Sequence, residues 1–154
     1  MLNADVLRSL RYALQINNYK IVETCELAGV LVTEAEIFDF LRPEEDPDAL
    51  PCPDEVLAGF LDGVIYRQRG KDESRPMPPF ELPVTNNLVL KKLRVAFQLR
   101  EEDILELFTS QGFSFGKAEL SAVLRKKGHP NYRECGDQAL RNFLKALTVK
   151  IHEA

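Results

Sequence analysis

Basic side chains in the second half of this chain have the types and spacing to bind anions. Two adjacent lysines, Lys126 and Lys127, begin a polar stretch that also contains a histidine and an arginine. Clustered cations attract phosphate or carboxylate groups because their fields add over a small area. The sequence therefore predicts a partner-binding site made of Lys117, Arg125, Lys126, Lys127, His129 and Arg133.

Catalytic and metal-binding patterns are not found in the sequence. The two histidines, His129 and His152, have no equivalent in the first half, and no phosphate loop or nucleophile elbow occurs. Zinc sites usually take ligands in close pairs, and Cys25, Cys52 and Cys135 lie far apart. We expect no catalytic residue, metal or cofactor. The cysteines are interpreted as buried small residues in a reducing compartment.

The elements that must position these side chains come from an internal duplication. Residues 3–71 and 86–154 align without a gap at a constant offset of 83, with 20 identical positions. Asn3 aligns with Asn86, Cys52 with Cys135, and most other pairs are conservative. A register held over the whole length indicates one structural unit present twice.

Each copy is predicted to form four helices. The first carries an apolar stripe at helical spacing, and the second ends at Gly29 or Gly112, where a left-handed cap favours glycine. The third begins with the capping-box pattern Thr33–Glu36, and the fourth begins near Asp54. No strand pattern of alternating residues is present.

The predicted fold is therefore all-α, with two tandem four-helix repeats at residues 1–71 and 86–154. The connector, residues 72–85, holds four prolines and cannot continue a helix. A unit of about 70 residues buries a small share of its surface. We therefore expect the repeats to pack around one core.

Polar residues shared by both copies suggest a structural tie within each repeat. Arg11 and Arg94 occupy equivalent places on the first helix, and Asp54 and Asp137 begin the fourth. We expect an Arg11–Asp54 pair and an Arg94–Asp137 pair to join these helices, with the carboxylates also stabilising the helix starts.

Net charge divides unevenly between the repeats. Residues 1–83 hold 8 Lys and Arg against 16 Asp and Glu, whereas residues 84–154 hold 12 against 8. The loop before the fourth helix has a charge of −4 in residues 43–51 and +2 in residues 126–134 with His neutral. Drift on solvated loops explains this difference. Complementary docking, between the repeats or head to tail between chains, also explains it.

Nucleic-acid binding is the alternative function. Residues 103–127 have the length and glycine position of a helix-turn-helix, which would present Lys117, Ser121 and Arg125 to a groove. The matching face of the first copy carries Glu34, Glu36 and Asp39, which would repel a phosphate backbone. At most one repeat could therefore read DNA or RNA in this way.

Three long strings resemble a known family. They are Asn86–Arg94 (NNLVLKKLR), Arg69–Glu73 (RGKDE) and Arg133–Gln138 (RECGDQ). They identify the chain as similar to the YehS-like bacterial family, the tandem-repeat domain of unknown function 1456. The resemblance covers nearly the whole chain. It implies a cytoplasmic bacterial protein and supplies no activity, cofactor or catalytic residue to carry over.

Together these patterns predict a cytoplasmic, non-catalytic protein-binding module, with a protein partner or a second copy as the favoured ligand. The first residues carry Asp5 and no apolar run, so no secretory signal is expected. No stretch approaches the length of a membrane span, and no membrane association is predicted.

Overall fold

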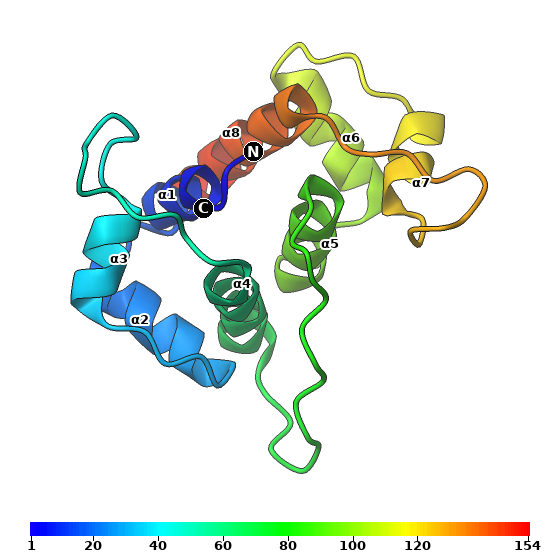
Figure 1. Ribbon diagram of the computed structural model, residues 1–154. Coiled ribbons are helices and arrows are strands. Elements are labelled where there is room, and N and C mark those ends of the chain that lie inside the picture. The colour runs from blue at the N-terminus through cyan, green and yellow to red at the C-terminus, as the bar shows by residue number, and fades with distance from the viewer.

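A computed structural model describes residues 1–154 and contains eight helices and no strand (Figure 1). In the first repeat the helices are α1 (Asn3–Leu14), α2 (Asn18–Leu27), α3 (Glu34–Phe40) and α4 (Asp54–Arg69). In the second they are α5 (Asn86–Ala96), α6 (Glu101–Ser110), α7 (Lys117–Leu124) and α8 (Asp137–Glu153). The predicted all-α tandem repeat is confirmed.

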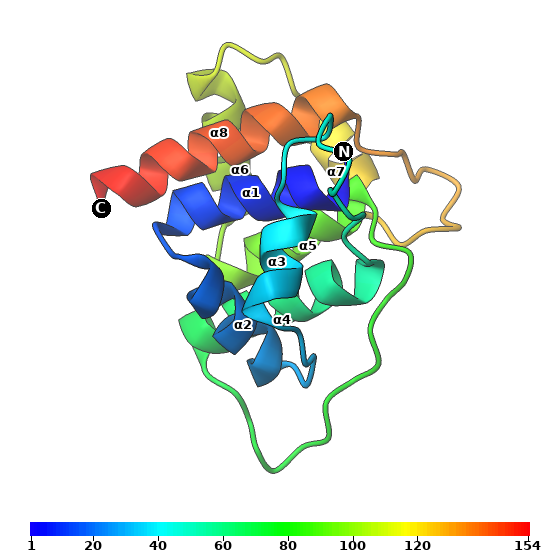
Figure 2. The same ribbon diagram turned by 60° about the vertical axis from the view of Figure 1, so that its left-hand side comes forward.

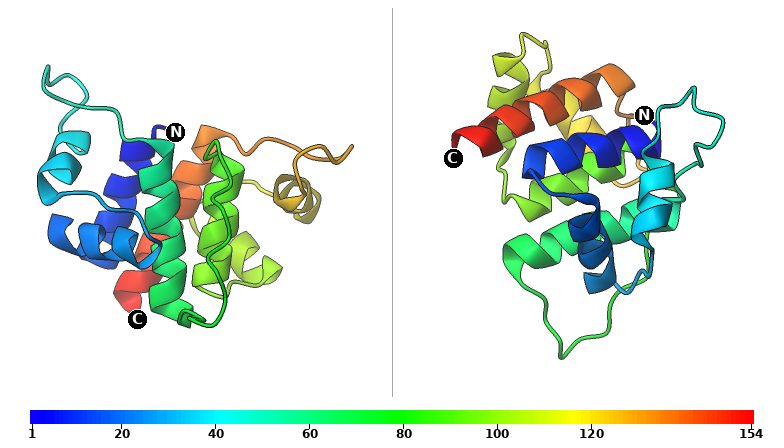
Figure 3. Two further views of the ribbon diagram at one scale, coloured as in Figure 1. Left: turned by 60° about the horizontal axis from the view of Figure 1, so that its bottom comes forward. Right: turned by 90° about the vertical axis from the view of Figure 1, so that its left-hand side faces the viewer.

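The first helix of each repeat packs mainly on the last helix of the other repeat. Helix α1 packs on α8, the last helix of the other repeat, and α5 packs in the equivalent way on α4 (Figures 1 and 2). Contacts of α1 with α4 and of α5 with α8 are sparser. Helices α1, α4, α5 and α8 thus form a central bundle with internal pseudo-twofold symmetry. Helices α2 and α3 flank one side of it, and α6 and α7 flank the other (Figure 3).

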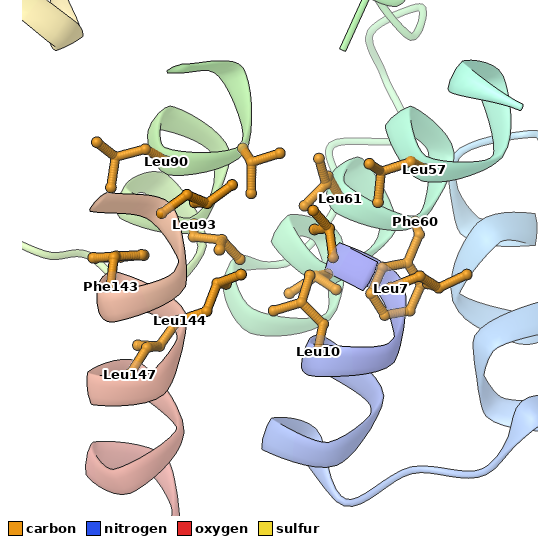
Figure 4. Packing of buried hydrophobic residues seen from close by; sticks show 14 of the residues in the cluster. Leu7, Leu10, Leu57, Phe60, Leu61, Leu90, Leu93, Phe143, Leu144 and Leu147 are labelled. Carbon is orange, nitrogen blue, oxygen red and sulfur yellow. The ribbon is translucent and has the colours of Figure 1, made fainter. Parts of the chain in front are cut away.

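A single hydrophobic core runs through this bundle. One cluster of 32 buried residues contains side chains from both repeats. Figure 4 shows Leu7 with Phe60 on one side and Leu90 with Phe143 on the other, and between them lie Leu10, Leu61, Leu93 and Leu144. Burying a side chain of this size stabilises a fold by about 1.5–3 kcal/mol. The shared core confirms that the repeats form one globule.

Helix ends follow the local sequence signals. Gly29 and Gly112 have φ of 80° and 66°, the left-handed conformation expected after α2 and α6. Thr33 and Glu36 form the predicted capping box at α3. Gln15 and Gln98 adopt φ of 54° and 52° after α1 and α5. These two positions are left-handed without being glycine, and sequence reasoning did not predict them.

Two glycines let α2 and the segment that follows it approach α4 closely. A Cβ atom on Gly63 would lie 1.9 Å from the backbone oxygen of Thr24, and one on Gly59 would lie 2.5 Å from a methyl group of Val30. The second repeat has Asn142 and Ala146 at these positions, and the α6–α8 contact is less extensive. Small residues at matched positions therefore set how tightly each flanking helix packs.

The predicted Arg11–Asp54 and Arg94–Asp137 pairs are wrong. Arg11 donates to the Asn18 side chain at 2.8 Å, and Arg94 donates to the Leu99 carbonyl at 3.2 Å. Each arginine therefore donates a hydrogen bond to a residue just beyond the end of its own helix. A position shared by both copies indicated a shared contact, and the contact is with the local turn.

Asparagines make the ties that were predicted for the arginines. The amide nitrogen of Asn3 donates to Asp54 Oδ1 at 2.7 Å and to the Cys52 carbonyl at 3.0 Å. Asn86 makes the same two bonds, to Asp137 at 2.7 Å and to the Cys135 carbonyl at 2.9 Å.

Each aspartate also binds a residue outside its own repeat. The Val84 N–H, at the end of the connector, donates to Asp54, and the ammonium group of Met1 contacts Asp137. The bonds from Met1 and then Asn86 hold the pKa of Asp137 below its usual value. The residues just before α1 and α5 are therefore bonded to the start of α8 and α4, respectively.

The connector returns the chain from the end of α4 to the start of α5 without a helix. Lys71 Nζ donates to the Leu27 carbonyl at 3.0 Å, which holds the start of the connector against α2. None of the eight helices combines the length and the hydrophobicity that a membrane crossing requires.

Candidate functional site

The loops before α4 and α8 have the same backbone frame. The Asp46 N–H donates to the Pro43 carbonyl at 2.9 Å, and the His129 N–H donates to the Lys126 carbonyl at 3.0 Å. The last part of each loop is bound to the preceding helix, by Leu50 N–H to Asp39 O at 3.2 Å in the first repeat. The second repeat has Arg133 N–H to Ala122 O at 3.1 Å. The duplication thus preserved the loop backbone while its side chains changed.

In the first repeat an internal arginine partly neutralises this loop. Arg42 binds Asp39 at 2.9 Å and Asp46 at 3.2 Å. The Asp48 N–H donates to Asp46, and this bond, followed by the Arg42 contact, lowers the pKa of the Asp46 carboxyl group. Glu44, Glu45 and Asp48 are exposed and have no salt bridge. We call residues 43–51 the acidic loop.

In the second repeat the same frame lacks the carboxylate that binds the arginine. Arg125 is equivalent to Arg42, and His129 stands at the position of Asp46, with 3.3 Å between Arg125 Nη1 and His129 Nε2. The Asn131 N–H donates to His129 Nδ1 at 3.0 Å, so a neutral ring carries its proton on Nε2 and does not accept from Arg125. Arg125 is therefore without an acceptor, whereas Arg42 binds Asp46.

The remaining cations of this loop are free. Lys126, Lys127 and Arg133 are exposed, and no carboxylate lies within salt-bridge distance of them. We call residues 125–133 the basic loop. Lys126 and Lys127 line a recess of about 220 Å³ together with Lys91, Tyr132 and connector residues that include Leu82. Arg133 lines a neighbouring recess, which shares Tyr132.

A buried asparagine fixes the basic loop to α5. Asn87 is 4% exposed, and its amide nitrogen donates to the Val123 carbonyl at 3.0 Å and the Arg133 carbonyl at 2.8 Å. Its oxygen accepts the Cys135 N–H at 2.9 Å. The first repeat has Ala4 at this position, so only the basic loop is held to the bundle by hydrogen bonds of this kind. Asn87 was not among the predicted site residues. The signal that could have indicated its role is that an asparagine occurs at this position in one copy only.

Replacing Asn87 by alanine is expected to lower the free energy of unfolding by about 2–3 kcal/mol. The substitution leaves buried backbone groups of Val123, Arg133 and Cys135 without a partner, and each such group is costly. Urea denaturation followed by circular dichroism measures the change. Asn142→Ala is the matched control, because Asn142 bonds one carbonyl within its own helix. Equal effects for the two variants would contradict the assigned role.

The segment that joins α6 to α7 differs in geometry from the predicted helix-turn-helix. Six residues separate α6 from α7, whereas the motif uses a turn of three or four. Phe113 and Phe115 in this segment pack on Phe108, with ring centroids 5.6 and 4.3 Å away. Lys117 is the first residue of α7, and Arg125 follows its last. Five of the six predicted cationic positions are therefore together in the basic loop, and Lys117 lies outside it.

The cysteines lie in the interior. Cys25, Cys52 and Cys135 are free thiols and are buried. Burial raises the pKa of Cys25 and Cys52 to about 12 and that of Cys135 to about 11. At neutral pH they are therefore protonated and poor nucleophiles. No three His, Cys, Asp or Glu side chains gather in an arrangement suited to a metal ion.

A further recess lies between α1 and α8 and was not predicted. It is an open groove of about 650 Å³ lined by residues that include Tyr12, Lys145 and His152. His152 Nε2 lies 3.2 Å from the Tyr12 carbonyl, and the two rings meet edge to face. None of the titratable residues that line this groove is buried.

The fold defines a class of all-helical, internally duplicated proteins in which two repeats pack around one core. In this chain the loops before α4 and α8 differ in charge. A family model described as "Protein of unknown function (DUF1456)" matches residues 3–70 and 86–152. The chain therefore belongs to the DUF1456 family. It is 47% identical over 152 residues to the uncharacterised protein YehS of Escherichia coli (strain K12), covering 99% of this chain and 97% of that protein. No solved structure matches the chain.

Proposed function

We propose that this chain is a non-catalytic protein-binding module whose basic loop receives an acidic segment of a partner protein. The observation that carries the proposal is that Arg125 has no carboxylate partner, whereas its equivalent in the first repeat, Arg42, binds Asp46. A carboxylate from a partner would accept from Arg125, as Asp46 accepts from Arg42.

The surroundings of this arginine favour an acidic protein segment. Lys126, Lys127 and Arg133 supply exposed positive charge, and the frame fixed by Asn87 lowers the entropy lost on binding. Leu82 is 47% exposed beside the recess and offers an apolar contact that a nucleic-acid backbone would not use. Free, buried thiols are consistent with work in a reducing cytoplasm.

Nucleic-acid binding is the competing outcome. Lys91, Lys126 and Lys127 around Tyr132 are the residue types that track a phosphate backbone and stack a base. Glu81 from the connector lines the same recess, and Glu134 follows the loop. These carboxylates repel either anion, so the feature that favours the protein partner is the exposed Leu82, which a phosphate backbone would not contact.

Titration of the chain into a labelled Asp/Glu-rich peptide tests the proposal by fluorescence anisotropy at low salt. We expect saturable binding that weakens as salt is added, because the contact is between exposed charges. The variant K126E/K127E/R133E should bind at least about tenfold more weakly, because its loop then repels the peptide.

The matched control reverses three exposed cations elsewhere, in R69E/K145E/K150E, and should retain most of the affinity. Parallel titrations use a labelled DNA duplex and a single-stranded RNA. Tighter binding of either nucleic acid, with log affinity falling linearly in log salt, would replace the proposal with the nucleic-acid function. No binding of any probe at low salt would overturn both.

A further inference from the structure

The acidic loop has exposed carboxylates without a cation, and the basic loop has exposed cations without a carboxylate. The two loops do not contact each other within one chain. Figure 1 shows the loop between α3 and α4 and the loop between α7 and α8 on opposite sides of the bundle. No salt bridge joins residues of one loop to residues of the other. Docking between the repeats of a single chain, one of the alternatives from the sequence, is therefore absent from this structure.

We propose that a second copy of this chain supplies the acidic segment, so that the acidic loop of each molecule docks on the basic loop of the other. The inference rests on the proposed function, because it names the partner of the same site. In the acidic loop, Glu44, Glu45 and Asp48 are exposed and have no cation partner, and in the basic loop Lys126, Lys127 and Arg133 are exposed and have no carboxylate partner.

Apolar groups beside the two loops add to this complementarity. Leu50 in the acidic loop is 50% exposed, and the neighbouring Leu2 is 55% exposed. Both line a recess of about 420 Å³ beneath the acidic loop. Leu82 is exposed beside the recess of the basic loop. Contact between these leucines would remove apolar surface from water on both molecules, which charge attraction alone does not do.

The internal pseudo-twofold symmetry favours an assembly of two chains. It relates the loops to each other, so both lie at the same height along the pseudo-twofold axis. A second molecule turned by a twofold axis perpendicular both to this axis and to the line joining the two loops would bring acidic loop to basic loop at both sides at once. Such an isologous contact closes at the dimer, whereas a single loop pair would leave open ends.

Charge-exchange variants test the inference by sedimentation velocity at about 20 mM and about 500 mM salt, where screening lengths differ several-fold. The wild-type chain is expected to dimerise at low salt and to dissociate at high salt. E44K/E45K/D48K has two basic loops and K126E/K127E/R133E has two acidic ones, so each alone is expected to be monomeric. Their equimolar mixture should restore the dimer, because both loop pairs are then complementary.

The control replaces E44K/E45K/D48K in the mixture with E26K/E73K/E153K, which has the same net charge and reverses exposed carboxylates outside the loop. This mixture should form no more dimer than expected from its own components. A monomeric wild type at low salt, or a mixture of exchanged variants that stays monomeric, would overturn the inference. If the acidic peptide still binds E44K/E45K/D48K in that case, the proposed function stands and the second copy is excluded as its partner.

Discussion

Gly63→Ala is expected to lower the free energy of unfolding by about 3 kcal/mol or more. The added methyl group would lie 1.9 Å from the Thr24 backbone oxygen and 2.7 Å from its carbonyl carbon. A backbone atom cannot move aside as a flexible side chain can, so α2 would have to shift away from α4. Overpacking of a core contact usually costs about 1–3 kcal/mol, and a backbone clash lies at the upper end.

Gly136→Ala is the control for this prediction. A Cβ atom on Gly136 would meet nothing within 4 Å, and its φ of −69° suits any residue. Its stability should therefore stay within about 0.5 kcal/mol of the wild type. Urea denaturation of both variants measures the difference. If the Gly63 variant matched the Gly136 variant, the close approach of α2 to α4 would be refuted.

Lys92→Met is expected to destabilise the fold by about 2–4 kcal/mol, because it leaves the buried Asp62 carboxylate without a counter-charge. Lys92 Nζ of α5 lies 2.8 Å from Asp62 Oδ1 of α4, and the side chains are 25% and 11% exposed. Asp62 Oδ1 has no hydrogen bond of good geometry, so the stabilisation is mainly electrostatic.

The double variant Asp62→Leu/Lys92→Met separates the cost of a lone charge from the value of the pair. Replacing both members with apolar groups removes the desolvation penalty, so its stability should return to within about 1 kcal/mol of the wild type or exceed it. Denaturant titrations of the two single variants and the double variant complete the cycle. A double variant less stable than Lys92→Met would show that the ion pair is a net stabilising contact.

This ion pair also shows how the two halves of the bundle diverged. The positions equivalent to Lys92 and Asp62 are Ser9 and Lys145, which lie in the groove between α1 and α8. The α4–α5 contact thus has an ion pair that is largely shielded from solvent, and the α1–α8 contact has a lone exposed cation at the equivalent place.

Local features could be predicted from the sequence, and contacts between helices could not. Gly29, Gly112 and the Thr33–Glu36 capping box depend on backbone preferences of a few neighbouring residues, so a pattern suffices. Pairing Arg11 with Asp54 required knowing which helix faces which. In the structure Asn3 reaches Asp54 instead, because the N-terminal ends of α1 and α4 meet.

For the candidate site too, the positions of the charged residues could be predicted from the sequence, and the contacts between residues could not. Opposite charge in equivalent loops is readable from the duplication alone, and five of the six proposed cationic positions gather in one loop. The role of Asn87 and the contact between Arg125 and His129 were not predicted. Both depend on where a loop folds back on a helix, which residue spacing does not encode.

The packing of α1 on α8 has a consequence for synthesis of the chain. Helix α1 leaves the ribosome before its main partner, α8, has been translated. Until residues 137–153 emerge, the face of α1 that contacts α8 stays exposed in the nascent chain. Translation of the second repeat therefore sets how long this apolar surface is open to chaperones or to aggregation.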